Sequence, residues 1–210
     1  MLSVLFYLFL FVICTFFLVL SAVALLLTWP FDKSRRIVHE LSRILVRIFY
    51  AVPPLWKFRV TGREYIDRRK PYVIVVNHQA GLDIPTLYFV PLNFRWVSKR
   101  EVFKVPFFGQ FLLLHGDICI NRGHATAAME KVIRAFTLAR EAGVEILPVV
   151  LDGTTTMIGR NGMFNWRNKL TVSILPPVSA ERVAAADPKE LMEQVRASMC
   201  VRLAEIRKQK

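Results

Sequence analysis

The sequence predicts an α/β domain, a mainly parallel sheet flanked by helices, behind one N-terminal transmembrane helix. Three observations support this prediction. Residues 1–31 are uncharged and apolar, short β-rich runs alternate with helical stretches after residue 55, and Tyr72–Val76 is apolar throughout, as a strand covered on both faces should be. We therefore expect a transmembrane anchor over 1–31, a basic amphipathic helix over 32–54 and a catalytic-sized domain over 55–210.

The anchor is defined by composition. Residues 1–31 contain no Asp, Glu, Lys or Arg, and 26 of the 31 are apolar. A helix over Met1–Trp29 would extend about 40 Å, which is enough to cross the hydrocarbon of a bilayer. A cleaved signal peptide is the alternative, although no basic region precedes the apolar run. Because Lys33, Arg35 and Arg36 follow the span, the positive-inside rule predicts a single-pass membrane protein whose domain lies on the cytoplasmic face.

The net charge of +13 lies entirely after residue 31 and is densest just beyond the anchor. Between Asp32 and Lys70 there are 11 Lys or Arg residues against 4 acids, so we expect this region to bind an anionic membrane surface. Nucleic acid is disfavoured as a partner because no zinc-finger spacing, RNP-like segment or heptad-bearing basic region is present.

The apolar residues of 33–52 recur at helical spacing, which predicts an amphipathic helix that ends at Pro53. This helix either packs on the domain or lies in the headgroup layer.

The domain is predicted to contain further strands and at least two helices. A helix over Ala125–Ala142, stopped by Gly143, is expected to join two strands in a βαβ unit. A tail helix begins at the cap Asp187, with Pro188 at its first position. The strands expected besides Tyr72–Val76 are Phe94–Val97, Asp117–Asn121, Glu145–Leu151 and Leu170–Leu175.

The chemistry is expected at the polar cluster after the strand Tyr72–Val76, because parallel sheets place ligands at the carboxyl ends of their strands. His78 is followed five residues later by Asp83. That spacing lets the carboxylate bind one imidazole nitrogen while the other acts as a base. The alternative is a structural histidine with Asp83 as a helix cap. The three cysteines, Cys14, Cys119 and Cys200, are too few and too scattered for a zinc site, and no metal is expected.

The stretch Asn77-His78-x-x-x-x-Asp83 resembles the N-H-x4-D box of the glycerolipid acyltransferases, the lysophosphatidate acyltransferase family. Two further blocks resemble that family in the same order, over roughly residues 30–180. They are Lys99-Arg-Glu-Val-Phe-Lys-Val-Pro-Phe-Phe-Gly with Gly116-Asp-Ile-Cys-Ile-Asn-Arg122-Gly123, and Ile146-Leu-Pro-Val-Val-Leu-Asp-Gly153.

The resemblance implies a fold of that family and a set of site residues. His78 would be the general base that deprotonates the glycerol hydroxyl of a lysophospholipid, and Asp83 its orienting partner. Asn77 or nearby N–H groups would stabilise the oxyanion, and Lys99 and Arg122 would bind the acceptor's phosphate. Attack is direct and needs no enzyme nucleophile, in agreement with the absence of a G-x-S-x-G elbow from the sequence.

The sequence departs from the family pattern at two places. Ala80 stands where the box usually has Ser, and no Glu-Gly-Thr-Arg block occurs anywhere. Met129–Arg134 runs directly into Ala135–Gly143, as if one strand and one helix, roughly thirty residues, had been lost. The alternatives are a natural short variant with a substitute cation, a catalytically weak relative, or an accidental loss of sequence.

The function expected from the resemblance is acyl transfer to a lysophospholipid in phospholipid biosynthesis, most directly 1-acylglycerol 3-phosphate giving phosphatidic acid. The acyl donor would be acyl-CoA or acyl carrier protein, the latter also a candidate protein partner, and no cofactor is expected. A membrane-anchored esterase or thioesterase and a catalytically inactive lipid-binding relative are the alternative functions.

Overall fold

The computed structural model describes residues 2–53, 55–120 and 128–209 of the chain. The chain divides into two compact units, one formed by Met1–Pro54 with Leu92–His124 and the other by Leu55–Pro91 with Ala125–Lys210. Each unit is built from two separate stretches of sequence. We describe them as the first and the second unit.

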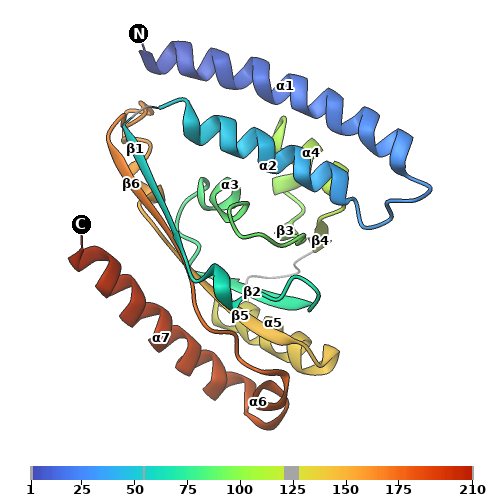
Figure 1. Ribbon diagram of the computed structural model, residues 1–210, viewed down its shortest axis with the longest axis vertical. Coiled ribbons are helices and arrows are strands. Elements are labelled where there is room, and N and C mark those ends of the chain that lie inside the picture. The colour runs from blue at the N-terminus through green and yellow to red at the C-terminus, as the bar shows by residue number, and fades with distance from the viewer. Residues whose placement is uncertain (1, 54, 121–127, 210) are drawn as a thin grey trace. The chain divides into compact units, whose positions relative to one another are not determined.

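The first unit is a set of helices with a small two-stranded sheet (Figure 1). Its long helices, α1 and α2, pack side by side, and the ring of Phe6 stacks on that of Phe49 with centroids 5.8 Å apart. Since Phe6 is near the start of α1 and Phe49 near the end of α2, the two helices are antiparallel. The elements are α1 (Leu2–Thr28), α2 (Arg36–Ala51), β3 (Val97–Lys99), a 3-10 turn η2 (Val102–Lys104), α4 (Phe108–His115) and β4 (Ile118–Ile120).

Among the described residues, α1 is the one helix long and apolar enough to cross a membrane, with a mean hydropathy of 2.9. The predicted N-terminal apolar helix is therefore present. The apolar residues that recur at helical spacing in α2 were expected to form one stripe that includes Ile37 and Ile44, but these two side chains are exposed. The α2 side chains that are buried are Val38, His39, Ser42, Leu45, Val46, Phe49 and Tyr50.

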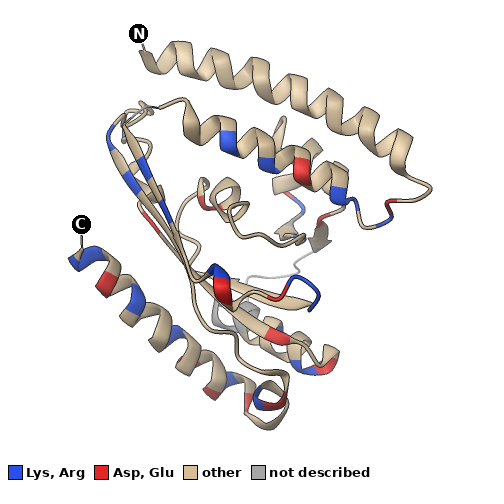
Figure 2. Ribbon diagram, in the orientation of Figure 1, with Lys and Arg blue, Asp and Glu red and all other residues tan. Residues whose placement is uncertain are grey.

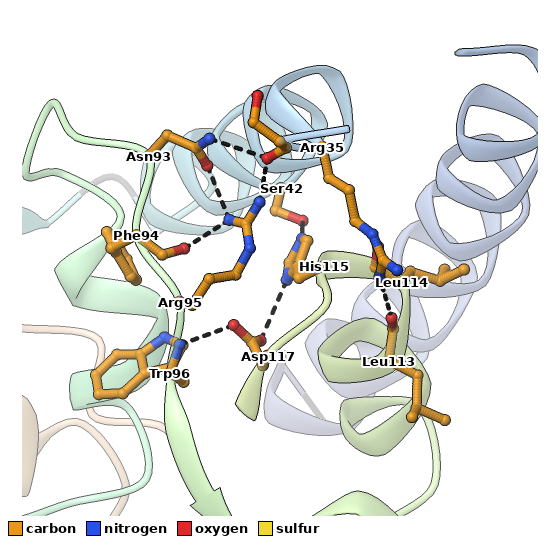
Figure 3. Close-up of polar contacts among 11 residues, drawn as sticks. Arg35, Ser42, Asn93, Phe94, Arg95, Trp96, Leu113, Leu114, His115 and Asp117 are labelled. Carbon is orange, nitrogen blue, oxygen red and sulfur yellow. Dashed lines mark hydrogen bonds and ion pairs between the residues drawn. The ribbon is translucent and has the colours of Figure 1, made fainter. Parts of the chain in front are cut away.

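Arg35 ties the start of α2 to the end of α4 (Figure 3). Its guanidinium donates to the carbonyls of Leu113 and Leu114 at 2.7 and 3.1 Å, in the last turn of α4, where the Leu113 carbonyl also accepts the N–H of Gly116 at 3.1 Å. The Arg35 backbone has a φ of 50°, an uncommon left-handed conformation for a non-glycine residue. Gly116 has a φ of 75°, which favours glycine, and a Cβ there would lie 2.8 Å from the guanidinium, so a side chain at this position would displace the Arg35 cap.

The second unit contains a four-stranded sheet in the order β1-β6-β5-β2. β1 pairs with β6 and β2 with β5 in parallel, whereas β5 and β6 are antiparallel. The elements are β1 (Trp56–Thr61), a 3-10 turn η1 (Arg63–Tyr65), β2 (Tyr72–Val76), α3 (Asp83–Leu87), α5 (Ala128–Ala142), β5 (Glu145–Asp152), a 3-10 turn η3 (Thr154–Thr156), β6 (Asn168–Ile174), α6 (Ala180–Ala185) and α7 (Pro188–Lys208).

The core of the second unit lies between the sheet and the helices α5, α6 and α7 (Figure 1). Phe136 of α5, Ile146 of β5 and Leu191 of α7 are almost fully buried there. As predicted, Asp187 caps α7 by accepting the backbone N–H groups of Lys189 and Glu190, both at 3.0 Å. This packing fixes the sheet on which the polar cluster after β2 is mounted.

The predicted fold class is confirmed, with two corrections to individual elements. The βαβ unit is wrong, because β4 pairs with β3 in a separate sheet while β5 has β2 on one side and β6 on the other. Both edges of β5 are thus occupied, and β4 has no place beside it. The predicted strand Phe94–Val97 is also wrong in its bounds, because the strand in this region is β3, Val97–Lys99. Trp96 precedes it, and its N–H donates to the Asp117 carboxylate instead of to a neighbouring strand. Residue 121 of the predicted strand Asp117–Asn121 and residues 125–127 of the predicted helix Ala125–Ala142 lie outside the described residues.

We predict that His39 makes the first unit less stable in mild acid. Burial, with smaller contributions from the neighbouring His115, Arg43 and Arg95, lowers the pKa of His39 from 6.5 to about 3. Between these two values the unfolded chain takes up a proton that the folded chain does not, so stability falls as pH falls from 6.5. The loss is up to about 1.4 kcal/mol per pH unit in this range.

Thermal unfolding of the detergent-solubilised protein between pH 4.5 and 7 measures this effect, with His39→Gln as the comparison. The variant should lose much of the pH dependence of the unfolding temperature. Equal slopes for the two proteins would contradict the prediction.

Candidate functional site

The candidate site lies where β2 ends. The strand stops at Val76, Asn77 and His78 follow at the carboxyl edge of the sheet, and Asp83 begins the short helix α3. The tight return of the chain between them is closed by the hydrogen bond from the N–H of Asp83 to the carbonyl of Ala80, at 3.0 Å. The local fold therefore brings His78 and Asp83 together, as their spacing predicted.

His78 and Asp83 form a hydrogen-bonded pair. The Nδ1 atom of His78 is 3.0 Å from Oδ2 of Asp83. The His78 side chain is 52% exposed, whereas that of Asp83 is 1% exposed. Because Nδ1 faces the buried carboxylate, the tautomer that fits carries its proton on Nδ1, and Nε2 is then the basic nitrogen.

The Asp83 carboxylate is held by more than the imidazole. The same Oδ2 atom accepts the backbone N–H groups of Gln79 and Ala80 at 2.5 and 2.8 Å. Burial alone would raise the pKa of Asp83, but hydrogen bonds from His78, Thr154 and these two N–H groups hold that pKa below its usual value. The group therefore stays a carboxylate at neutral pH.

The Asp83 carboxylate raises the pKa of its partner His78. The hydrogen bond to Asp83 raises the pKa of His78 above its ordinary value, and partial burial offsets only part of the rise. A raised pKa makes the neutral imidazole a stronger base. The pair can thus remove a proton from a hydroxyl that approaches Nε2.

Asn77 makes a two-point contact with β5. Its amide Nδ2 donates to the carbonyl of Leu151 at 2.8 Å, and its Oδ1 accepts the N–H of Leu151 at 2.7 Å. This contact extends the β2–β5 pairing by one residue and fixes the backbone directly before His78. The predicted contact of Asn77 with substrate stays a prediction.

The described geometry does not test the two predicted phosphate ligands. Lys99 is the last residue of β3 and belongs to the first unit, whereas His78 belongs to the second. Arg122 lies outside the described residues. The roles of both residues stay predictions.

Sequence reasoning missed an apolar hollow beside the site. The hollow has a volume of about 480 Å³ and reaches Asn77 and Gln79, the two chain neighbours of His78. Phe136 of α5 and one side of α7 form its walls. The apolar spacing of α7 indicated a buried stripe, but only the packing reveals that part of it lines a hollow.

A second Ser–His–Asp arrangement, in the first unit, has a different character (Figure 3). Ser42 Oγ lies 2.6 Å from Nε2 of His115, whose Nδ1 is 3.7 Å from Asp117. Ser42 and His115 are only 4% and 3% exposed, so the hydroxyl is enclosed by the packing of α2 on α4. We interpret this arrangement as a structural network.

Within the described residues, no three His, Cys, Asp or Glu side chains gather as a metal site would require.

Comparison with known proteins identifies the family. The sequence model of the family described as Acyltransferase matches residues 57–179, more than half of the chain. The chain belongs to the acyltransferase family. The matched range includes β2, the His78–Asp83 pair and the sheet that supports it, and the resemblance drawn from the motifs is confirmed.

Relatives with a common name match much of the chain. A Saccharomyces cerevisiae protein named 1-acyl-sn-glycerol-3-phosphate acyltransferase is 28% identical, covering 80% of this chain and 68% of its own. An Escherichia coli protein of the same name is 25% identical, covering 77% and 80%. A Chlamydomonas reinhardtii relative is matched over 49% of its length, so the chain spans from about half to four fifths of these relatives.

The fold also matches a solved structure. The crystal structure of the 1-acyl-sn-glycerophosphate (LPA) acyltransferase PlsC from Thermotoga maritima superposes with a TM-score of 0.71. The superposition covers 98% of this chain and 96% of that one, at 18% sequence identity. At this identity the match establishes the fold.

The lengths of two matches leave room for positions of the relatives that have no counterpart in this chain. The match to the yeast relative runs over 207 positions but takes in 80% of these 210 residues, about 168, which leaves about 39 positions without a counterpart here. The match to the E. coli relative runs over 197 positions and takes in 77%, about 162 residues, which leaves about 35. Both differences are close to the strand and helix that the missing Glu-Gly-Thr-Arg block would bring.

We predict that Asp83→Asn weakens the base and shifts its pH dependence. With His78 as the predicted base, acyl transfer requires the neutral imidazole, so we expect activity to fall as pH drops through the raised pKa of this residue. Without the carboxylate that pKa falls, and the acidic limb of the kcat/KM profile should move to lower pH while the maximal rate drops about 10² to 10⁴-fold. The control is Asp67→Asn, which removes a carboxylate outside the site. If the acidic limb of the Asp83→Asn variant lies at the same pH as that of the wild type, the prediction is contradicted.

Proposed function

We propose that the chain transfers an acyl group from an acyl thioester to the free hydroxyl of a lysophospholipid, with 1-acylglycerol 3-phosphate as acceptor and phosphatidic acid as product. The observation that carries the proposal is the His78–Asp83 pair at the carboxyl edge of the sheet, with Nδ1 and Oδ2 3.0 Å apart. The common name of the relatives supports the choice of acceptor.

The proposed reaction is a direct displacement. Nε2 of His78 takes the proton of the acceptor hydroxyl as the oxygen attacks the thioester carbon. The tetrahedral intermediate then collapses and the carbon–sulfur bond breaks. The imidazolium donates its proton to the departing sulfur, so the thiol leaves and His78 returns to its neutral form. Asp83 stays ionised throughout, orients the ring and stabilises its charged form.

The other predicted residues take supporting roles. We assign Asn77 the positioning of His78 through its contact with Leu151, in addition to the predicted substrate contact. Lys99 and Arg122 remain the proposed ligands of the acceptor's phosphate, for which a fixed cation is the physical requirement.

We propose that the apolar hollow beside Asn77 and Gln79 receives an acyl chain. Its walls are largely aliphatic and include Val75, Met199 and Leu203. Each methylene moved there from water contributes about 0.8 kcal/mol. One end of the hollow is lined by Asn77 and Gln79, the chain neighbours of His78.

We propose a membrane location for the whole chain. The helix α1 would enter the hydrocarbon, and the cations between Asp32 and Lys70 would meet anionic headgroups. The domain is then on the cytoplasmic face, beside the leaflet that contains its lipid acceptor. Acyl-CoA and acyl carrier protein are the proposed donors, and no cofactor is required by the reaction.

An assay with labelled acyl-CoA and a panel of lysolipids tests the proposal. The membrane fraction should form labelled phosphatidic acid from lysophosphatidate, and His78→Ala should lower the rate about 10³-fold or more. The control is His124→Ala, a histidine that we assign no role. Release of free fatty acid without dependence on the lysolipid would favour a thioesterase. Equal activity of wild type and His78→Ala would overturn the catalytic assignment and favour a lipid-binding relative.

We predict that Cys200→Phe shortens the preferred acyl chain. Cys200 is an exposed residue of α7 that lines the hollow, so a larger side chain should narrow the space without disturbing the core. Activity with long-chain thioesters should fall about tenfold relative to short-chain ones, since few methylenes decide such selectivity. Ala197→Phe, on the exposed side of the same helix, is the control. If Cys200→Phe has the same chain-length profile as the wild type, the acyl chain does not bind in this hollow.

A further inference from the structure

The two oxygens of the Asp83 carboxylate have different surroundings. Oδ2 accepts three hydrogen bonds, from His78 and from the N–H groups of Gln79 and Ala80. Oδ1 is buried and, among the described residues, has no partner at ordinary hydrogen-bond distance. A buried polar atom without a donor costs free energy, and the cost is larger for a charged group. A donor that approaches Oδ1 is therefore important for the whole pair.

The charge of Asp83 is stabilised by hydrogen bonds and not by a fixed cation. Within the described part of the chain, the ion pair that Asp83 makes is with His78. Figure 2 shows the start of α3 in red and no blue on that helix. The contributions that lower the pKa of Asp83 are hydrogen bonds from His78, Thr154 and two backbone N–H groups. With no Lys or Arg beside the carboxylate, each of these donors is significant.

The chain that follows β5 passes the carboxyl end of β2. Leu151 of β5 is bound through both its N–H and its carbonyl by Asn77, the residue that follows β2. β5 ends at Asp152, and Gly153 then turns the chain with a φ of 96°, a conformation that favours glycine. Thr154 begins the 3-10 turn η3 directly after this glycine. The turn thus starts at the same edge of the sheet as the candidate site.

The turn that contains Thr154 is braced from β6. Asn168 Nδ2 donates to the carbonyl of Gly153 at 2.8 Å, and Oγ1 of Thr156 lies 3.0 Å from the same carbonyl. Thr156 Oγ1 is also 3.1 Å from Oδ1 of Asn168. Of the three successive threonines, Thr154 is 4% exposed, whereas Thr155 and Thr156 are exposed. The turn therefore holds one threonine inside the unit and leaves Thr155 at the surface.

The Thr154 hydroxyl fits the second oxygen of the carboxylate. Oδ2 already accepts three hydrogen bonds, more than the two lone pairs of one oxygen, so a further donor suits Oδ1. The contact is a long one here, because Oδ1 has no partner at ordinary distance. Hydrogen bonds of active sites are often long before substrate binds and shorten in the reacting complex.

We propose that Thr154 is a positioning residue of the base, whose buried hydroxyl donates to Asp83 and holds that carboxylate toward His78. Thr154 acts through Asp83 and not on the reacting atoms. The inference rests on the proposed function, since it concerns the same base. When Nε2 of His78 takes a proton, the imidazolium is stabilised by a fully charged carboxylate opposite it. The Thr154 donor keeps that carboxylate charged and prevents it from rotating away.

Kinetics of Thr154 variants tests this role. Thr154→Val keeps the size of the side chain but removes the donor, and Thr154→Ala also lacks it. Both should lower kcat for acyl transfer about tenfold or more, while the KM of each substrate stays within about twofold of wild type. Thr154→Ser keeps the donor and should remain within about threefold of the wild-type kcat. Thr155→Val is the control, because it removes an exposed hydroxyl from the same turn.

A titration of Asp83 tests the contact without catalysis. Carbon-13 NMR of labelled aspartate carboxyl groups in the detergent-solubilised protein follows this titration, with the Asp83 signal identified by its loss in Asp83→Asn. Loss of a donor to the charged form raises the pKa of a carboxyl group. The pKa of Asp83 should therefore rise in Thr154→Val and stay at the wild-type value in Thr154→Ser and Thr155→Val.

Three results would overturn the proposal. A wild-type kcat in Thr154→Val and Thr154→Ala rules out the positioning role, and an unchanged pKa of Asp83 in Thr154→Val rules out the contact. A loss of kcat that Thr154→Ser does not restore would assign Thr154 to packing instead.

The titration also keeps this inference distinct from the proposed function. If the wild type transfers no acyl group but Thr154→Val raises the pKa of Asp83, the contact is retained and the proposed function fails. If the wild type transfers acyl groups and Thr154→Val changes neither kcat nor the pKa of Asp83, the proposed function is retained and this inference fails.

Discussion

The candidate site depends on one carboxylate. Oδ2 of Asp83 accepts from His78 and from the backbone N–H groups of Gln79 and Ala80, so the same atom folds the turn after β2 and orients the base. Its near-complete burial strengthens these contacts and would make the charge costly if any of them were lost. Structure and chemistry are coupled here, because a change that frees the carboxylate also frees the imidazole.

The sequence predicted the part of the site that is local. His78 and Asp83 are five residues apart, and a strand end followed by a helix start brings them together without help from distant sequence. The sequence also indicated Asn77 as a site residue, but it did not predict the contact of Asn77 with Leu151. Leu151 lies on another strand, and the pairing of strands is decided by tertiary packing. For the same reason the sequence missed β1 and assigned β4 to the sheet of β5. The amphipathic helix between two apolar runs predicts a crossover, but not the sheet that each run joins.

The missing Glu-Gly-Thr-Arg block is the remaining difference from the family pattern. About 35 to 39 positions of two relatives have no counterpart here, and the block that would carry a phosphate-binding Arg is absent from the sequence. The fold accommodates this loss, because α5 remains one periodic helix and Phe136 and Ala139 still enter the core. Acceptor binding therefore falls to Lys99 and Arg122 in our account.

The central claim is that Asp83 makes His78 a base whose free nitrogen is Nε2. Nitrogen-15 NMR of labelled histidines in the solubilised protein tests this claim most directly, with the His78 signals identified by their loss in His78→Gln. Our account predicts a proton on Nδ1, an unprotonated Nε2 in the neutral ring, and a pKa for His78 above the ordinary value of about 6.5. A neutral ring protonated on Nε2, or a His78 pKa at or below the ordinary value, would contradict it.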